Sequence, residues 1–232
     1  MKYTNIVKGV FLSRPNRFIA EVEVDSVAYT VHVKNTGRCR ELLQKGVTVY
    51  LEKSSNPNRK TAFDLVVVEK RREGKENLLV NMDSQIPNAV AYEWLKGENP
   101  LFSENAKIRR EVTFGDSRFD LYVEDGERKA FVEVKGVTLE QDGLSLFPDA
   151  PTLRGVKHIN ELIKARQAGF EAYILFVIQM KEVHTFSPHK KMHEDFAQAL
   201  LKAKNEGVGV LAYDCKVTPN SLEIDEEVAV IM

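Results

Sequence analysis

Hydrophobic and polar residues alternate in short segments along the first 80 residues of the chain. Alternation with a period of two is typical of strands that bury one face and expose the other. The pattern predicts five strands, at residues 6–12, 18–24, 29–33, 47–51 and 62–68. Between the third and fourth of these strands, residues 37–43 predict a short helix closed by Gly46. This order is that of an OB-type barrel, and a small SH3-like barrel or sandwich is the alternative.

From about residue 82 the pattern changes to mixed helices and strands. Helices are predicted at 87–95, from the cap residue Thr152 through Ala168, and at about 189–205. Strands are predicted at 107–114, 118–123, 129–135, 172–178 and 208–213. The sequence therefore predicts an α/β (α+β) protein of two domains: an OB-like five-stranded β-barrel at residues 1–80, and a domain with a mixed sheet at residues 81–232.

The composition of the 232 residues, 43% hydrophobic and 29% charged, is that of a soluble globular protein. No apolar run approaches the roughly 18 residues of a membrane span, and the first residues lack the pattern of a signal peptide. The two cysteines, Cys39 and Cys215, are far apart and fit a reducing cytoplasm better than a disulfide framework or a zinc site. We therefore expect a cytoplasmic protein that has no membrane partner.

Charge is divided unevenly between the two predicted domains. Residues 1–80 carry 15 Lys and Arg against 9 Asp and Glu, a net +6, whereas the remainder carries 18 against 25, a net −7. A basic domain attracts phosphate, and an acidic domain repels it unless its carboxylates are paired or hold metal ions. The division indicates two domains with different roles and hints at nucleic acid as a partner.

Asp120, Glu133 and Lys135 are the candidate catalytic residues. Glu133 and Lys135 are two apart on one predicted strand and share a face, and a hairpin at 124–126 brings Asp120 beside them. Two carboxylates can hold Mg²⁺ or Mn²⁺, while a lysine orients a hydrolytic water or stabilises charge on a phosphate. The αβββαβ order of this domain matches the core of the PD-(D/E)xK restriction-endonuclease-like fold. The alternative is a lysine that is paired among carboxylates for structural reasons.

Two further residues are predicted at the same site. Glu93, on the helix before the three strands, is a candidate third carboxylate and metal ligand. Gln179 directly follows the buried strand 172–178, where it would bond water, a metal-bound ligand or phosphate. The alternatives are a surface charge for Glu93 and an exposed strand end for Gln179.

Residues 136–158 lack apolar periodicity and predict a long connection, which is typically functional or mobile. Arg154, Lys157 and His158 lie in the first turns of the helix that follows, where cations are poorly placed relative to the helix dipole. A phosphate or carboxylate ligand would compensate them, and pairing with nearby carboxylates is the alternative.

In the first domain, basic residues beside turn residues predict a groove that follows a phosphodiester backbone. The candidates are Arg14, Arg17, Asn35, Arg38, Arg59 and Lys60. Phe18, Tyr29 or Phe63 would provide platforms on which bases stack. Because Arg and Lys are also ordinary surface residues, exposure without a ligand is the alternative for each.

Several ordered motifs together resemble the sugar fermentation stimulation protein A family. They are R-x-N-R-F at 14–18, V-H-x-x-N-T-G-R at 31–38, N-P-x-R-K-T at 56–61, S-R-F-D at 117–120, V-E-V-K-G-V-T-L at 132–139, F-P-D-A at 147–150, R-G-x-K-H at 154–158, F-V-x-Q at 176–179 and L-A-Y-x-C at 211–215. The resemblance runs from about residue 11 to 230. It implies an OB-like domain followed by a PD-(D/E)xK-type domain, DNA binding without sequence specificity, and a role in regulating maltose metabolism. The nuclease-like motif of the family falls on Asp120, Glu133 and Lys135.

Together, the residues and the resemblance favour a protein that binds single- or double-stranded DNA and hydrolyses it with Mg²⁺ or Mn²⁺. The first alternative is a non-catalytic DNA-binding regulator of sugar metabolism on a nuclease fold. A metabolite or oligosaccharide sensor is a third hypothesis, with no aromatic sugar platform to support it. A homodimer is compatible with each of the three.

Overall fold

The computed structural model describes residues 1–97 and 99–232, which form two compact units. The first unit comprises Met1–Ile86, Gln179–Lys181 and Cys215–Glu223. The second comprises Pro87–Ile178, Glu182–Asp214 and Ile224–Met232. Two short segments from the later part of the chain thus complete the first unit.

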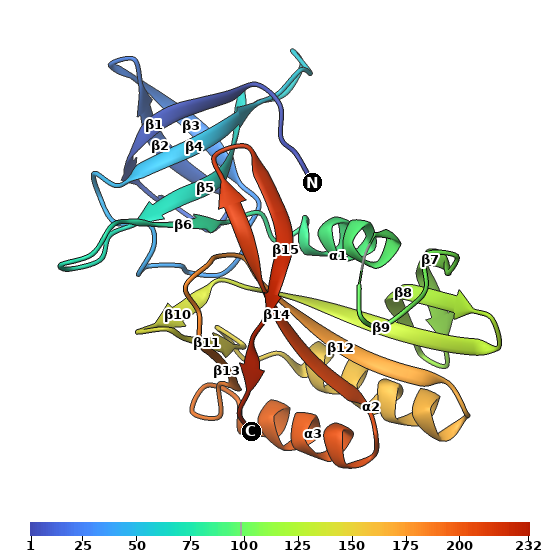
Figure 1. The fold of residues 1–232 in the computed structure, drawn as a ribbon. Coiled ribbons are helices and arrows are strands. Elements are labelled where there is room, and N and C mark those ends of the chain that lie inside the picture. The colour runs from blue at the N-terminus through green and yellow to red at the C-terminus, as the bar shows by residue number, and fades with distance from the viewer. Residues whose placement is uncertain (98) are drawn as a thin grey trace. The chain divides into compact units, whose positions relative to one another are not determined.

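The first unit contains a closed barrel of five strands (Figure 1). These are β1 (Ile6–Ser13), β2 (Ile19–Val24), β3 (Val27–Val33), β4 (Thr48–Lys53) and β5 (Phe63–Lys70). Neighbours pair antiparallel in the order β3-β2-β1-β4-β5, and a parallel pairing of β3 with β5 closes the barrel. Ala20 and Val22 of β2 are buried while the glutamates between and after them are not, which is the alternation seen in the sequence. The predicted five-stranded OB-type barrel is confirmed.

The predicted helix at residues 37–43 is wrong, because another side chain takes the carbonyls that a helix would use. The guanidinium group of Arg14 donates to the carbonyl oxygens of Gly37 and Arg38, at 2.8 and 2.7 Å. In a helix these oxygens would accept from the N–H groups four residues later. Cys39 also has φ +45°, which breaks a right-handed helical path. The segment is therefore made of turns fixed by Arg14.

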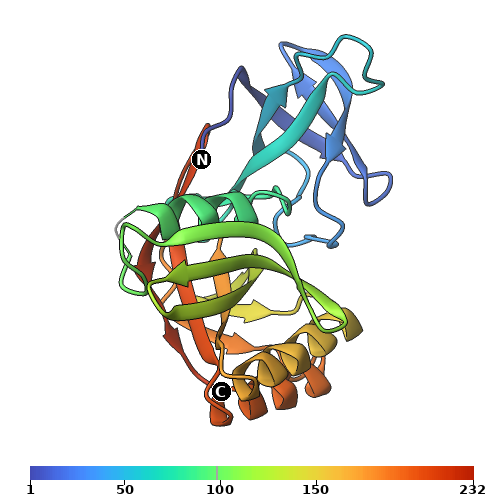
Figure 2. The same cartoon turned by 90° about the vertical axis from the view of Figure 1, so that its right-hand side faces the viewer.

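The second unit is built on a mixed sheet with helices on both faces (Figures 1 and 2). Its helices are α1 (Pro87–Lys96), α2 (Leu153–Gln167) and α3 (Glu194–Asn205), and its long strands are β7 (Lys107–Phe114), β8 (Ser117–Asp125), β9 (Arg128–Val137), β12 (Glu171–Ile178) and β14 (Gly209–Thr218). β7, β8 and β9 pair antiparallel, whereas β9, β12 and β14 pair parallel. α1 covers one face of the sheet, and α2 and α3 cover the other (Figure 2). The predicted αβββαβ order and mixed sheet are confirmed.

α2 begins and ends as the sequence predicts. The Thr152 hydroxyl accepts the N–H of Gly155 at 3.0 Å, so it satisfies one of the free donors at the start of the helix. Gly169 follows the helix with φ +92°, a conformation that glycine adopts without strain. This start matters for function because residues in the first turns of α2 contact β9.

Residues 136–158 are not the long irregular connection that the sequence predicts. They contain β10 (Leu139–Gln141) and β11 (Leu144–Phe147), which form an antiparallel hairpin. Asp142 and Gly143 both have positive φ, 51° and 85°, as a two-residue type I′ turn requires. The Asp-Gly dipeptide is the hairpin signal that the sequence analysis missed.

The remaining strands are β6 (Leu78–Asn81), β13 (Thr185–Pro188), β15 (Ser221–Glu227) and β16 (Ala229–Val230). α3 begins at Glu194, later than predicted, because β13 pairs with β11 and His193 is extended at the helix cap. None of the helices in the described ranges is long and apolar enough to cross a membrane.

Candidate active site

Glu133, in the middle of β9, is the centre of a group of charged side chains in the second unit. Its carboxylate is buried, with 1% of the residue exposed. Oε1 accepts hydrogen bonds from Lys135 Nζ, at 2.5 Å, and from His158 Nδ1. Oε2 is buried as well but has no hydrogen-bond partner. An unmet acceptor of this kind costs about 1–3 kcal/mol, and more when it is charged, so Oε2 is an oxygen that can accept a further donor or a cation.

Asp120 on β8 lies beside this group. Leu121 of β8 pairs with Val132 of β9. Because the strands are antiparallel, the next pair in the same register is Asp120 opposite Glu133. Oδ2 of Asp120 accepts the backbone N–H of Val134 at 2.8 Å, and Oδ1 accepts from the side-chain amide of Asn88 at 2.6 Å. The strand period and the hairpin therefore bring together the three residues that the sequence singles out.

The two carboxylates affect each other's ionisation. The pKa of Asp120 lies above its ordinary value, because burial and the negative charge of Glu133 both disfavour the ionised form. Burial would also raise the pKa of Glu133, but the hydrogen bond from His158 and the positive charge of Lys135 outweigh it and hold the pKa below its ordinary value. Glu133 is therefore firmly ionised, whereas the charge of Glu133 disfavours ionisation of Asp120.

His158 belongs to this site and is buried, with 7% of the residue exposed. Its Nε2 lies 3.3 Å from Nε of Arg154, one helical turn earlier. Because arginine only donates, Nε2 accepts, and the imidazole proton sits on Nδ1, where it is donated to Glu133. The sequence predicts Arg154 and His158 as phosphate contacts, whereas in the structure they form a series of hydrogen bonds that ends on Glu133.

The third cation at the start of α2 has a different partner. Lys157 is exposed and donates to the backbone carbonyl of Asp116 at 2.9 Å. Glu161, farther along α2, is a nearby carboxylate, and it is paired with Lys164 at 2.6 Å. The structure therefore brings only His158 of the three into direct contact with the central carboxylate.

α1 contributes Asn88 to the hydrogen bonds of Asp120. Glu93 is exposed and lies five positions later on the same helix. At 3.6 residues per turn, Glu93 is rotated by about 140° from Asn88 around the helix axis. Asn88 was not found from the sequence, since a single asparagine near a helix start carries no signal of its own.

Gln179 has its side chain in the core of the first unit and is 1% exposed. Its amide nitrogen lies 3.1 Å from the Asn81 carbonyl, 2.9 Å from Asn81 Oδ1 and 3.0 Å from the Asp83 carbonyl. Both N–H donors are used by these acceptors. The structure gives Gln179 a role in joining Gln179–Lys181 to β6.

The residues predicted to contact DNA in the first unit fall into two groups. Arg14 donates to four backbone carbonyls at 2.6–2.9 Å, and Arg59 forms a two-point hydrogen bond with Asp64, at 2.6 and 2.9 Å. Both guanidinium groups thus have structural partners instead of free donors. Asn35 is buried and accepts the N–H of Gly37 at 2.8 Å. The exposed candidates are Arg17, Arg38 and Lys60.

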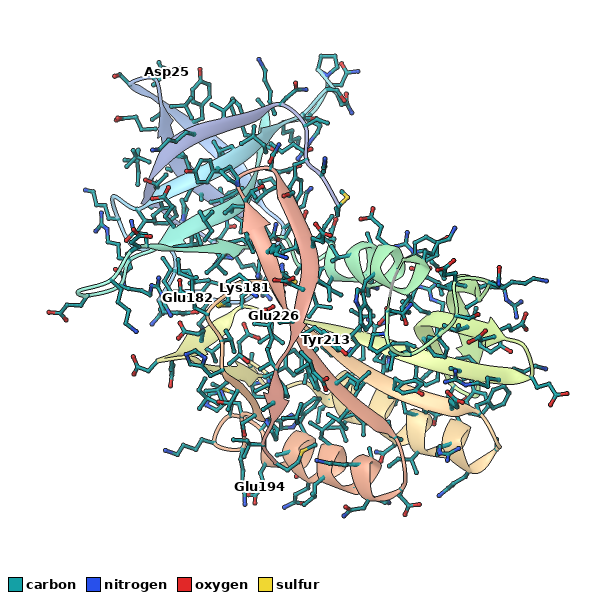
Figure 3. All side chains as sticks on the ribbon, viewed as in Figure 1. Asp25, Lys181, Glu182, Glu194, Tyr213 and Glu226 are labelled. Atoms are coloured by element: carbon teal, nitrogen blue, oxygen red, sulfur yellow. The ribbon has the colours of Figure 1, made fainter. Side chains whose placement is uncertain are left out.

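A second acidic group lies on β14 and β15. Among the described residues, Asp214, Asp225 and Glu226 form the group of three metal-ligand types whose atoms lie within 4.8 Å of one another. Figure 3 shows Glu226 where β15 runs beside β14, close to Tyr213. Asp214 accepts the backbone N–H of Glu226 at 2.9 Å, so its carboxylate already stabilises the strand pair. The unmet oxygen of Glu133 is the stronger sign of a ligand.

Asp120 and Glu133 fit a hard divalent cation. Mg²⁺ and Mn²⁺ prefer carboxylate oxygens, and the buried, unpartnered Oε2 of Glu133 is an oxygen of this kind. His158 and Lys135 hold the other oxygen, so they orient the carboxylate from outside the ligand set. The arrangement can bind a cation next to a lysine, which is the composition of a phosphodiester-hydrolysing site.

Comparison with known proteins covers both units. A family described as "SfsA N-terminal OB domain" matches residues 12–81, and one described as "Sugar fermentation stimulation protein RE domain" matches residues 85–221. The two matches account for most of the chain.

Two bacterial proteins are similar to this chain over nearly their whole length. A "Sugar fermentation stimulation protein homolog" of Desulfitobacterium hafniense (strain Y51) is 56% identical over 230 residues, which is 99% of this chain and 98% of that protein. Another, of Ruminiclostridium cellulolyticum, is 52% identical over 230 residues, 99% of each chain.

A solved structure has the same fold. "The structure of Pyrococcus Furiosus SfsA in complex with Ca2+" matches with a TM-score of 0.83 and 28% identity, covering 100% of this chain and 98% of that one. The likeness in fold extends over both units.

Proposed function

Because this chain belongs to the sugar fermentation stimulation protein family, we propose that it binds DNA without sequence specificity and hydrolyses phosphodiester bonds at Asp120, Glu133 and Lys135. The observation that carries the proposal is the buried, unpartnered Oε2 of Glu133 beside a second carboxylate and a lysine. A site that served only structure would have no reason to leave this oxygen without a donor.

In this proposal Asp120 and Glu133 hold Mg²⁺ or Mn²⁺. A cation would offset the repulsion that raises the pKa of Asp120, and it would satisfy Oε2 of Glu133. When bound, it would neutralise charge on the phosphate and lower the pKa of a water molecule. The Pyrococcus furiosus relative is described in complex with Ca²⁺, a hard cation that also prefers oxygen ligands.

Lys135 acts on the phosphate or on the attacking water. Its side chain is 18% exposed, whereas that of its partner Glu133 is 2% exposed. The buried carboxylate therefore binds the amine of Lys135, which still reaches solvent. An ammonium group has three N–H donors, of which Glu133 takes one. The others can donate to a phosphate oxygen and stabilise the charge that develops on it during hydrolysis.

We assign Asn88 of α1 to this site as the residue that orients Asp120. Its amide donates to Oδ1 of Asp120, and this leaves Oδ2 with the Val134 N–H, so the carboxylate is fixed by two bonds. Glu93, rotated away from Asn88 on the exposed helix surface, would join only as a more distant charge.

The test is cleavage of end-labelled single- and double-stranded DNA in Mg²⁺, Mn²⁺ or EDTA. Wild type, Lys135→Ala and Lys129→Ala are compared, because Lys129 is an exposed lysine on the same strand and provides a matched loss of charge. We expect products from the wild type and Lys129→Ala only with a metal. Lys135→Ala should be slower by about 100-fold or more, the usual cost of losing one transition-state donor.

Equal products from wild type and Lys135→Ala would place the cleavage elsewhere and overturn the proposal. A non-catalytic DNA-binding regulator is the second candidate, favoured by the exposed arginines of the first unit, whose charge requires no metal. It predicts salt-sensitive binding in EDTA and intact DNA under every condition. That combination of results would replace hydrolysis with binding as the function.

A further inference from the structure

Four arginines line a cavity of about 340 Å³ in the first unit: Arg14, Arg17, Arg38 and Arg40. They come from two segments of the chain, one after β1 and one after β3. None of the residues that line the cavity is acidic. A concave surface with several positive charges and no carboxylate concentrates positive potential, which favours an anion.

Arg14 builds the floor of this cavity. Its two terminal nitrogens donate to the carbonyls of Arg17, Asn35, Gly37 and Arg38, so it ties the two segments together. Its Nε is buried and has no partner. Because neutral carbonyls and not carboxylates receive these bonds, the positive charge of Arg14 is kept within the cavity wall.

In the described part of the chain, the other three arginines are not held by carbonyls as Arg14 is, although Arg17 lies over the ring of Phe18. Arg17, Arg38 and Arg40 are exposed, and within residues 1–97 and 99–232 none of them forms an ion pair with a carboxylate. By contrast, exposed Arg109 and Arg118 of the second unit pair with Glu124 and Glu111, each at 3.3 Å. Guanidinium groups can bind phosphate with two parallel N–H donors, so three unpaired groups around one cavity suit a phosphate.

An exposed aromatic ring stands next to the cavity. Phe18 is 52% exposed, and the guanidinium group of Arg17 lies 5.5 Å from its ring centroid. Asn16 Oδ1 accepts the N–H groups of Phe18 and Ile19, at 2.8 and 3.2 Å, which fixes the backbone that presents the ring. Of the three platforms predicted from the sequence, Phe18 is the most exposed.

The other two aromatic residues are less exposed, at 37% for Tyr29 and 7% for Phe63. Phe63 is buried, and Tyr29 packs edge-on against it with ring centroids 5.3 Å apart. A base that stacks near the arginine cavity would therefore meet Phe18. Stacking requires an unpaired base face, which a duplex does not offer along its length.

We propose that the arginine cavity binds one phosphate group of a single-stranded nucleic acid, with the neighbouring base stacked on Phe18. The inference rests on the proposed binding of DNA and goes further, because it names the strand form and the residues that receive it. A free nucleotide presents the same phosphate and base, so the experiment includes a competitor that distinguishes a free nucleotide from a strand.

The experiment measures binding of a fluorescent oligothymidylate by fluorescence anisotropy in EDTA, where no metal-dependent cleavage occurs. The variants are Arg38→Ala, Arg40→Ala and Phe18→Ala, all at exposed positions, with Lys75→Ala as a control that removes one exposed charge of the same unit outside the cavity. Thermal unfolding of each variant verifies that it is folded. Competition with a duplex, with thymidine monophosphate and with inorganic phosphate identifies the ligand form.

We expect each arginine variant to weaken binding and to reduce the slope of log affinity against log salt by about 0.7. Phe18→Ala should weaken binding by about fivefold or more with the salt slope unchanged, because stacking is not electrostatic. Lys75→Ala should bind like the wild type, and the duplex should compete poorly.

Folded cavity variants that bind the oligonucleotide like the wild type would overturn the inference, and so would a duplex that competes as well as the single strand. If thymidine monophosphate competes at the same concentration as the oligonucleotide, the cavity binds a free nucleotide equally well. That result would overturn the proposal that its ligand is a nucleic-acid strand. A wild type that cleaves DNA in Mg²⁺ while the cavity variants bind normally would refute this inference alone. A wild type that binds the strand in EDTA but never cleaves it would refute only the proposed hydrolysis.

Discussion

Two buried carboxylates, one in each unit, have the same kinds of neighbour but differ in how many of their oxygens are used. Asp64 on β5 accepts hydrogen bonds from His32 at 2.9 Å and from both terminal nitrogens of Arg59, and Lys34 lies 3.4 Å away. Both oxygens of Asp64 are occupied. Glu133 also has a histidine and a lysine, but both donate to one oxygen and leave the other without a donor.

The difference shows what separates a structural charge cluster from a candidate site. Histidine, lysine and arginine around a carboxylate do not by themselves indicate chemistry, because the cluster at Asp64 has all three. The feature that separates Glu133 from Asp64 is its buried oxygen without a donor, and the proposed cation site rests on that difference. Variants of one carboxylate can therefore be compared with variants of the other.

The largest effect is expected from Glu133→Gln. Lys135 and His158 both donate to the Oε1 position, so the amide nitrogen of the glutamine must take the place of Oε2. A donor cannot ligate a cation, and the site keeps the carboxylate of Asp120 alone. Binding of Mn²⁺, measured by calorimetry, should weaken by about 100-fold or more, and cleavage should fall with it.

Glu127→Gln is the matched control for this variant, because Glu127 is an exposed glutamate in the turn between β8 and β9. It should bind Mn²⁺ like the wild type. If Glu133→Gln retained wild-type affinity for Mn²⁺, Oε2 would not be the ligand, and the contrast with Asp64 would have no functional meaning.

The next effect is on stability and comes from Asp64→Asn. Removing this charge leaves Arg59 without its carboxylate partner and leaves Lys34 with Asp83 alone, at 3.3 Å. We expect a loss of about 2 kcal/mol in the free energy of unfolding, less than the roughly 3–5 kcal/mol of a fully buried pair, because both cations keep some contact with water. Mn²⁺ affinity and cleavage should stay unchanged in the folded variant.

The pH dependence of unfolding tests the same residue. Burial opposes ionisation, but hydrogen bonds from Arg59 and His32 and the charge of Lys34 lower the pKa of Asp64 from 3.8 to about 2. A carboxyl whose pKa is lowered by folding contributes stability above its unfolded pKa and loses it as the pH falls through the folded value. The wild type should therefore lose stability between about pH 4 and pH 2, and Asp64→Asn should show a shallower loss. Parallel pH profiles would mean that the Asp64 cluster does not stabilise the fold.

The sequence allows the core of the Glu133 cluster to be predicted, but not its outer partners or the cluster at Asp64. Glu133 and Lys135 share a face because strands have a period of two, and a hairpin brings Asp120 to them; both facts are local. His158 arrives from α2 and Asn88 from α1, and only the packing of those helices against the sheet decides which of their residues reach β8 and β9.

The roles of arginines were the least predictable part. Arg14, Arg38 and Arg59 look alike in the sequence, each beside turn residues, yet Arg14 binds carbonyls, Arg59 binds Asp64, and Arg38 is exposed. Long side chains reach partners far along the chain, and the helix expected at residues 37–43 failed for the same reason. By contrast, the barrel and the αβββαβ order depend on periodicity, which the sequence carries directly.

The smallest effect is expected from His158, which touches Glu133 without supplying the proposed ligand oxygen. In His158→Ala, Oε1 keeps only Lys135, and the carboxylate is free to rotate, so Mn²⁺ affinity should fall by about tenfold. The side-chain nitrogen of an asparagine occupies the same position relative to Cβ as Nδ1, so His158→Asn should recover most of that loss. Calorimetry with Mn²⁺ measures both.

An equal loss in the alanine and asparagine variants would show that His158 acts through packing and not through its hydrogen bond. His32→Ala is the corresponding change at Asp64, and there it should leave Mn²⁺ affinity untouched, because Arg59 still donates to both oxygens of that carboxylate. A histidine on a saturated carboxylate is one partner among several, whereas the histidine on Glu133 decides which oxygen is presented to a cation.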